Sequence, residues 1–264
     1  MINCLSVILP TLNEEENLKI LIPSIQDVLD NNKIKNYEIL VVDDGSTDGS
    51  ESLVKTFNDN IKFFKRIEKK SLPMSISDGV KFSKYDNVMW LDADGSMNAE
   101  AIERLLKIFS ENVNSAVVGS RFVENGGYKG IEVSGQTGFL KAMYNVWKSN
   151  DSILATILSK VFNSILYVLL PGKVKDLTSG FIVLNKKFIN NKIFLISNYG
   201  DYFLYLINDL IKSNVNIIEV GYLCETRIHG ESKTGSNIFQ LINRGLPYIS
   251  AAVRCRIGNN ENIS

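Results

Sequence analysis

The sequence lacks the marks of the most easily recognised classes of protein. It has 29 Lys or Arg and 29 Asp or Glu residues among 264, so its formal net charge is zero. Nucleic-acid-binding domains are usually strongly basic, and this balance therefore argues against nucleic acid as the main partner. The three cysteines, Cys4, Cys224 and Cys255, are odd in number and far apart. They fit neither a metal cluster nor a disulfide framework, which favours a reducing compartment.

Signals for secretion, membrane crossing and the common nucleotide sites are also missing. Met1 leads straight into an apolar segment without a basic region, so we expect no secretory signal. The most apolar stretch, residues 153–170, is interrupted by polar side chains and is not expected to span a bilayer. No G-x-G-x-x-G follows an expected strand, and G-x-x-x-x-G-K-[ST] does not occur. A dehydrogenase or a P-loop NTPase is therefore disfavoured.

What the sequence does contain is an alternation of apolar and amphipathic segments along its first 120 residues. Apolar runs predict strands at 5–9, 38–42, 61–66, 87–91 and 116–119. Helices are expected between them, beginning near Asn13, at about 74–82 and near Asn98. Strands that alternate with helices form a mostly parallel sheet through right-handed crossovers. The predicted fold class is therefore α/β, with helices flanking the sheet.

The run at 87–91 ends in two carboxylates, Asp92 and Asp94. In extended backbone this spacing puts both side chains on the same side of the strand. Their mutual repulsion favours a divalent cation between them, and only two protein carboxylates suit Mg²⁺ or Mn²⁺, which also takes water and phosphate oxygens. The alternative interpretation is an acidic turn that caps the helix beginning near Asn98.

Two more polar clusters follow strands, Asn13-Glu14 and Asp43-Asp44. Parallel sheets bind ligands at the carboxyl ends of their strands. Three acidic clusters that fall at such ends are hard to explain as solvated turns, so we expect one ligand site at this edge.

Seven motifs of this sequence resemble those of known sugar transferases. The family 2 glycosyltransferases, which have the GT-A fold, share three motifs with it: PTLNEEENL at 10–18, VDDGSTDG at 42–49 and LDAD at 91–94. Four further motifs are similar to those of the dolichyl/polyprenyl-phosphate mannosyltransferases: GSRF at 119–122, DLTSGF at 176–181, YGDY at 199–202 and RIHGESK at 227–233. The resemblance implies a GT-A domain over residues 1–235 and a C-terminal helical tail over 236–264.

The resemblance also implies roles for the matched positions. The nucleotide sugar is expected to contact seven residues: Pro10, Leu12, Glu14, Asp43, Asp44, Arg66 and Asp92. The cation is expected at Asp92, Asp94 and the Ser96 position. Arg121, Arg227 and Lys233 are expected to serve the diphosphate or an acceptor phosphate, since guanidinium groups suit paired phosphate oxygens.

Three positions depart from the family pattern. Leu12 stands where many relatives have Tyr, which removes an aromatic stacking contact. Ser71-Leu72-Pro73 replaces a Gly-Leu-Gly element. Ile182 follows Gly180-Phe181 where the mannosyltransferase group usually has Arg, so one phosphate ligand is lost.

The expected reaction is metal-dependent, inverting transfer of a hexose, mannose or glucose, from GDP- or UDP-sugar to a polyprenyl or dolichyl phosphate. A phosphate monoester is already anionic near neutral pH, so this acceptor needs no strong general base. The first alternative is a GT-A enzyme with a hydroxyl acceptor, such as a glycan or glycolipid. The second, of another class, is a sugar-nucleotide-binding subunit without catalysis.

For two residues the sequence leaves two possible roles open. Asp201 precedes an apolar helix and is either a simple partner of the helix dipole or the group that acts as base or orients the acceptor. His229, the only histidine, lies between Arg227 and Lys233 and either contacts phosphate or is structural. The expected catalytic set is therefore Asp94, Asp201, Arg121, Arg227 and Lys233.

Two amphipathic segments bear on location, residues 153–170 and 238–256. Each is interpreted either as a helix packed on the domain or as a helix lying in a lipid interface. A lipid-linked acceptor would have to be met at a membrane. The expected location is therefore the cytoplasm, at the surface of the cytoplasmic face of a membrane, with room for a small membrane partner subunit.

Overall fold

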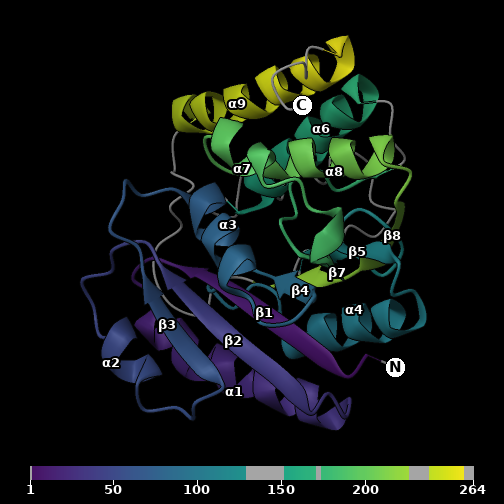
Figure 1. Ribbon diagram of the computed structural model, residues 1–264. Helices are drawn as coiled ribbons and strands as arrows, with labels where there is room; N and C mark the ends of the chain where they lie inside the picture. The colour runs from purple at the N-terminus through teal and green to yellow at the C-terminus, as the bar shows by residue number, and fades with distance from the viewer. Residues whose placement is uncertain (1, 129–151, 171–173, 226–237, 259–264) are drawn as a thin grey trace.

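A seven-stranded sheet forms the centre of the computed structural model, which describes residues 2–128, 152–170, 174–225 and 238–258 (Figure 1). The strand order is β3-β2-β1-β4-β7-β5-β8, and β7 runs antiparallel to both of its neighbours while the other pairs are parallel. The bounds are β1 (Cys4–Thr11), β2 (Asn36–Asp43), β3 (Ile61–Lys65), β4 (Asn87–Trp90), β5 (Ser115–Ser120), β7 (Ile182–Asn185) and β8 (Asn216–Gly221). The prediction of a mostly parallel α/β sheet is confirmed.

Helices cover both faces of this sheet (Figure 1). The bounds are α1 (Glu15–Asn31), α2 (Ser50–Val54), α3 (Leu72–Phe82), α4 (Ala99–Glu111), α6 (Ser152–Leu169), α7 (Lys192–Ile196), α8 (Tyr202–Lys212) and α9 (Ile238–Ile257). Side chains alternate between two cores along each central strand, so that Val7 and Leu9 pack toward α1 and α4 while Ile8 packs toward α3 and α8. Strands buried on both faces explain the continuous apolar runs of the sequence.

The antiparallel strand β7 was not predicted. It consists of four residues, and Ile182 pairs with Trp90 of β4 and with Val118 of β5. So short an apolar run carries no periodicity that separates it from other buried segments. A second, two-stranded parallel sheet, formed by β6 (Gly127–Tyr128) and β9 (Leu223–Cys224), was also not predicted.

The C-terminal helix α9 packs against the rest of the chain. Its Ala251 and Ala252 are fully buried in the core that α8 and α6 share, and Cys255 is 4% exposed. The ring of Tyr248 meets Phe162 of α6 edge-on, with centroids 5.7 Å apart. The expected boundary at 235/236 falls outside the described residues. Within the described residues, none of the helices combines the length and the apolar character that a bilayer crossing requires.

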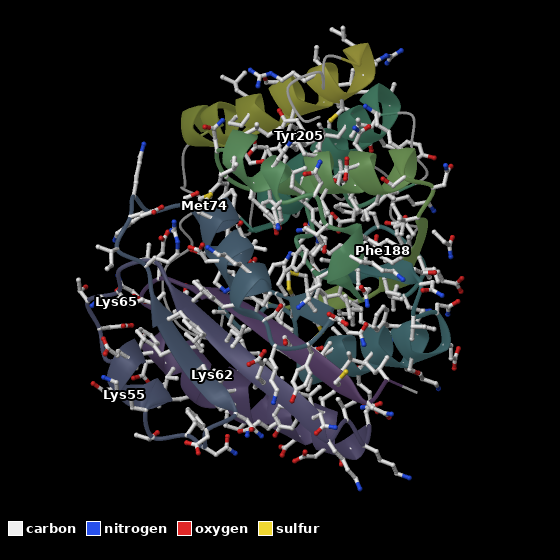
Figure 2. The ribbon with its side chains drawn as sticks, in the orientation of Figure 1. Lys55, Lys62, Lys65, Met74, Phe188 and Tyr205 are labelled. Atoms are coloured by element: carbon white, nitrogen blue, oxygen red, sulfur yellow. The ribbon has the colours of Figure 1, made fainter. Side chains whose placement is uncertain are left out.

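A buried carboxylate, that of Glu38, links neighbouring segments at the end of the sheet opposite the predicted site. Glu38 of β2 accepts hydrogen bonds from Ser6 Oγ (2.7 Å), from the backbone N–H of Lys84 (2.5 Å) and from Lys62 Nζ (2.8 Å; Figure 2 labels Lys62 on β3). Burial by itself raises the pKa of Glu38, but the hydrogen bonds from Lys62, Lys84 and Ser6 outweigh it and hold the pKa below its usual value.

We expect Glu38→Gln to lower the free energy of unfolding by about 1–3 kcal/mol near pH 7, because the substitution leaves buried donors poorly matched. The pKa of Glu38 is lower in the folded than in the unfolded chain, so its contribution is complete above the unfolded pKa. The contribution disappears as the pH falls through the folded pKa. Urea unfolding from pH 7 to pH 3 measures it, with Glu103→Gln on the exposed face of α4 as the control. A wild-type–variant difference that does not shrink in acid would contradict the assignment.

Candidate functional site

The polar clusters that follow β1, β2 and β4 lie at one edge of the sheet. Thr11 at the end of β1 pairs with Asp43 at the end of β2, and Ile8 pairs with Trp90 at the end of β4. The three strands are neighbours and parallel, so their carboxyl ends meet. The structure therefore brings the 12–14, 43–44 and 92–94 segments to the same edge.

The loops after β1 and β2 are joined by hydrogen bonds. The backbone N–H of Asn13 donates to Ser46 Oγ (2.7 Å), and the N–H of Thr47 donates to Asn13 Oδ1 (2.8 Å). A third hydrogen bond between the same loops runs from the N–H of Glu15 to Asp48 Oδ2 (3.0 Å). Asn13 has φ +56°, a conformation that Asn tolerates better than most residues. These bonds fix the edge before any ligand arrives.

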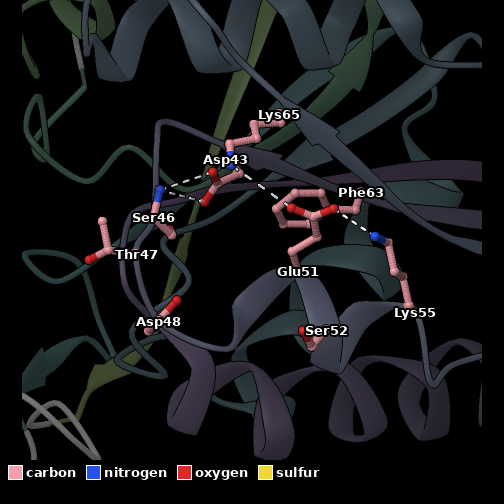
Figure 3. Close-up of a pocket in the computed structure, with 9 residues that line it drawn as sticks. All are labelled: Asp43, Ser46, Thr47, Asp48, Glu51, Ser52, Lys55, Phe63 and Lys65. Carbon is pink, nitrogen blue, oxygen red and sulfur yellow. Dashed lines mark hydrogen bonds and ion pairs between the residues drawn. The ribbon is translucent and has the colours of Figure 1, made fainter.

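Asp43 is fully buried and serves the turn that follows it. Its carboxylate accepts the N–H groups of Gly45 and Ser46, both at 3.0 Å, and Gly45 has φ +90°, which favours glycine. Behind it lies a cavity of about 380 Å³ (Figure 3). The cavity is lined by Asp43, Ser46, Thr47, Asp48, Glu51, Ser52, Lys55, Phe63 and Lys65. Its two lysines, Lys55 and Lys65, both pair with the single carboxylate of Glu51.

Arg66, which directly follows β3, forms the charged centre of the neighbouring loops. Its Nε donates to Asp78 Oδ2 (2.8 Å) and its Nη1 to Asp44 Oδ1, while the N–H of Ser71 donates to Asp44 Oδ2 (2.6 Å). Nη2 is buried and has no hydrogen-bond partner, and the carboxylate of Glu68 is 3.8 Å away. A buried guanidinium donor without a partner fits the nucleotide-binding role predicted for Arg66 and Asp44.

Asp92 and Asp94 follow β4, and neither caps the next helix. Helix α4 is capped by Asn98, whose Oδ1 accepts the N–H of Ala101 (2.9 Å). Asp94 is 6% exposed and its Oδ1 accepts the N–H of Ser96 (3.0 Å) across Gly95, which has φ +77°. The interpretation as an acidic helix cap is therefore wrong.

The donor set at 92–96 suits a hard divalent cation. Asp94 and Ser96 are buried and Asp92 is partly exposed, so two carboxylates and a hydroxyl are offered. Among the residues that the structure describes, no group of three or more His, Cys, Asp or Glu side chains could hold a metal ion by itself. A cation at this position would complete its shell with water and substrate oxygens, as Mg²⁺ does.

The 92–96 turn is tied to the second half of the chain. The N–H of Glu225 donates to the carbonyl of Ser96 (2.9 Å), and Asn98 Nδ2 donates to Glu225 Oε1 (2.7 Å). Burial raises the pKa of the adjacent Cys224 to about 11, and the carboxylates of Asp94 and Asp92 contribute to the increase. The thiol stays protonated at neutral pH and is not poised as a nucleophile.

The guanidinium group of Arg121 forms an ion pair with Asp176. Its Nε and Nη2 each donate to the carboxylate of Asp176 at 2.8 Å, Nη2 also reaches Thr178 Oγ1 (2.8 Å), and Asp176 is fully buried. Asn163 of α6 donates to the same Thr178 hydroxyl (2.8 Å). The structure places Arg121 as a cross-link between β5, the loop before β7 and α6. Its role toward phosphate stays a prediction, and sequence analysis did not pair it with Asp176.

Asp201 lies at the start of α8 and is 2% exposed. It accepts the N–H groups of Tyr199 (2.7 Å) and Asn198 (3.0 Å), which precede the helix, rather than those inside it. The next residue, Tyr202, accepts a hydrogen bond from the indole Nε1 of Trp90 (3.2 Å), two positions before Asp92. The start of α8 is thus anchored beside the end of β4.

Comparisons with known proteins identify the family. The profile described as "Glycosyl transferase family 2" matches residues 6–191, most of the chain. This chain is a member of glycosyl transferase family 2. The resemblance expected from the motifs is confirmed.

The relatives of this family 2 protein include polyprenyl-phosphate sugar transferases. The dolichol-phosphate mannosyltransferase of Pyrococcus furiosus is 29% identical over 243 residues, covering 90% of this chain and 61% of that protein. The polyprenol monophosphomannose synthase of Mycolicibacterium smegmatis is 27% identical over 243 residues, covering 88% and 82%. The chain therefore spans about three fifths of the first relative's length and most of the second's.

A solved structure with the same fold is glucosyl-3-phosphoglycerate synthase of Mycobacterium tuberculosis, crystallised with Mn²⁺, UDP-glucose and glycerol 3-phosphate. It has a TM-score of 0.63, is 15% identical, and the match covers 97% of this chain and 80% of that one. Another crystal of the same enzyme, with Mg²⁺ and UDP, gives 0.59. The GT-A fold predicted for this family 2 chain is confirmed.

The remaining predicted residues have different outcomes. Pro10, Leu12 and Glu14 lie along the end of β1, and each is partly exposed at the edge that Asp44 and Asp92 share. Ile182, the departure from the family pattern, is fully buried in β7. Arg227, His229 and Lys233 lie outside the described residues.

We expect Asp176→Asn to destabilise this family 2 protein by about 3–5 kcal/mol, because it leaves the largely buried charge of Arg121 without its partner. Asp86→Asn, which breaks the exposed pair with Lys186, is the matched control and should change stability by less than about 1 kcal/mol. Denaturant unfolding of both variants measures the difference. Equal, small effects would show that the Arg121–Asp176 pair is not a structural cross-link.

Proposed function

We propose that this protein is a metal-dependent, inverting glycosyltransferase that moves a hexose, mannose or glucose, from a GDP- or UDP-sugar to a polyprenyl or dolichyl phosphate. The observation that carries the proposal is the placement of Asp92 and Asp94 at the same sheet edge as Asp44 and Arg66. A diphosphate bridges a nucleoside and a sugar, so a donor that contacts both groups would lie along this edge.

Each group at the edge has a task that its chemistry suits. Arg66 and Asp44 lie side by side as a hydrogen-bonded donor and acceptor, and groups of this chemistry suit the polar edge of a base. A bound cation at Asp92 and Asp94 would neutralise the charge that develops on the leaving diphosphate. The turn that holds Asp94 through the Ser96 N–H is formed in advance, which lowers the cost of reorganisation during transfer.

The acceptor is proposed from the named relatives and from chemistry. The names of both relatives refer to dolichol or polyprenol phosphate, and the matches cover nearly the whole of this chain. An anionic acceptor oxygen needs positioning more than deprotonation. Asp201, which is fixed by backbone N–H groups, would orient such an acceptor, and Arg227 and Lys233 would balance its charge.

An exposed apolar surface supports action at a membrane. Val161, Ile165 and Val168 lie on one stripe of α6, and Val168 is 74% exposed. On the neighbouring helix α9, Leu246, Ile249, Val253 and Ile257 form a second stripe at helical spacing, with Arg254 and Arg256 exposed in its last turn. Apolar anchors beside cations suit an anionic lipid surface. We propose that these stripes lie on the cytoplasmic face of a membrane, where a small partner subunit would also bind.

We expect Asp94→Asn to reduce transfer at least about 100-fold, because the substitution removes a charge from the cation site. The assay offers radiolabelled GDP-mannose, UDP-glucose and UDP-N-acetylglucosamine separately with polyprenyl phosphate and Mg²⁺ or Mn²⁺. Asp59→Asn, on an exposed turn, is the control and should retain full activity. Full wild-type activity in EDTA would overturn the metal role, and donor binding without any turnover would indicate a non-catalytic subunit.

We expect the double variant Ile249→Glu/Val253→Glu to bind vesicles containing phosphatidylserine about 10-fold more weakly than the wild type, because it places charge on the proposed contact surface. Val113→Glu is a matched control, since Val113 is 42% exposed and Val253 is 40% exposed. Co-sedimentation with and without phosphatidylserine measures the change. A wild type that ignores vesicles of either composition would contradict the membrane proposal.

A further inference from the structure

Helix α9 contacts the residue before Asp201 through the side chain of Tyr248. Its ring rests edge-on against Phe162, and its hydroxyl lies against Gly200, the residue before Asp201. A Cβ placed on Gly200 would be 1.8 Å from the Tyr248 hydroxyl and 2.8 Å from its ring carbon. Position 200 therefore accepts only glycine while Tyr248 keeps its place.

The same turn is held from its other side by β4. The Trp90 indole donates to the Tyr202 hydroxyl (3.2 Å), and a Cβ on Gly180 would lie 3.2 Å from that hydroxyl. Between these two tyrosines, Asp201 accepts the N–H groups of Asn198 and Tyr199 and is almost fully buried. The turn that carries Asp201 is thus seated between β4 on one side and α9 on the other.

The phenol of Tyr248 has a raised pKa. Burial raises the pKa of Tyr248 above its usual value, and Tyr199, Asp201 and Asp92 raise it further. The phenol is therefore neutral at physiological pH and can act as a hydrogen-bond donor among these groups.

We propose that Tyr248 is a positioning residue for the transfer reaction: its hydroxyl seats the 199–201 turn and so fixes the carboxylate of Asp201 relative to Asp92. The inference rests on the function proposed above and deepens it, since it makes α9 part of the reaction centre as well as a membrane-facing helix. The exposed stripe of α9 and the contact of Tyr248 with Gly200 belong to the same helix.

The test compares Tyr248→Phe and Gly200→Ala with Tyr205→Phe as the matched control. Tyr205, labelled in Figure 2, is a buried tyrosine of α8 one helical turn after Asp201, in the core that α8 shares with α9. We expect Tyr248→Phe and Gly200→Ala to lower kcat for transfer to polyprenyl phosphate by about 10- to 100-fold, the range that a small misplacement costs. The Kd for UDP or GDP, from calorimetry without acceptor, should stay within about twofold of wild type because the donor edge is untouched. Tyr205→Phe should leave both unchanged.

Amide hydrogen exchange provides a second readout that does not depend on activity. The N–H groups of Asn198 and Tyr199 are protected by Asp201, and they should exchange faster in Tyr248→Phe than in wild type or Tyr205→Phe. Unchanged exchange in Tyr248→Phe overturns the inference, and so does faster exchange with an unchanged kcat. A wild type that transfers no sugar to polyprenyl phosphate refutes the proposed function, and the exchange rates then decide the inference alone.

Discussion

Repulsion among carboxylates is the constraint on which the site depends. Asp43, Asp44, Asp92 and Asp94 all follow strands that end at one edge of the sheet, so their negative charges are concentrated there. Contacts within the protein offset some of this charge. Asp43 accepts two N–H groups of its own turn, Asp44 pairs with Arg66, and Asp94 accepts the Ser96 N–H. In the function proposed above, a cation bound at Asp92 and Asp94 would relieve the repulsion between these two carboxylates.

The second half of the chain is attached to this edge by contacts between residues far apart in sequence. Arg121 and Asp176 join β5 to the loop before β7, Trp90 and Tyr202 join β4 to α8, and the 92–96 turn is bonded to Glu225. The polar or charged atoms in these contacts lie in buried or partly buried surroundings, where an unpaired group is costly. The site is therefore one assembled edge whose parts constrain each other, and the two helices nearest the proposed membrane surface are included in it.

Local sequence signals predicted the strands of the first half and the long helices α6, α8 and α9 of the second half well, and the strands of the second half poorly. Strands β1 to β5 were found within a few residues because they alternate regularly with polar turns and amphipathic helical segments, and parallel strands necessarily bring their ends together. The same signals could not find β7, whose four residues resemble any buried segment. They also could not pair Arg121 with Asp176 or Trp90 with Tyr202, since partners 55 and 112 positions apart leave no mark on local periodicity. The predicted roles of Arg227, His229 and Lys233 fall outside the described residues.

The position of β7 between β4 and β5 in the sheet affects how the chain folds during translation. One side of β4 can pair with β1 as soon as residue 90 is made, but its other side pairs with Ile182–Asn185. At about 5–20 residues per second, translation leaves that side of the strand bare for roughly 5 to 20 seconds. The strand that leads to Asp92 and Asp94 therefore keeps one unpaired edge during this interval, and such an edge can pair with another chain until β7 covers it.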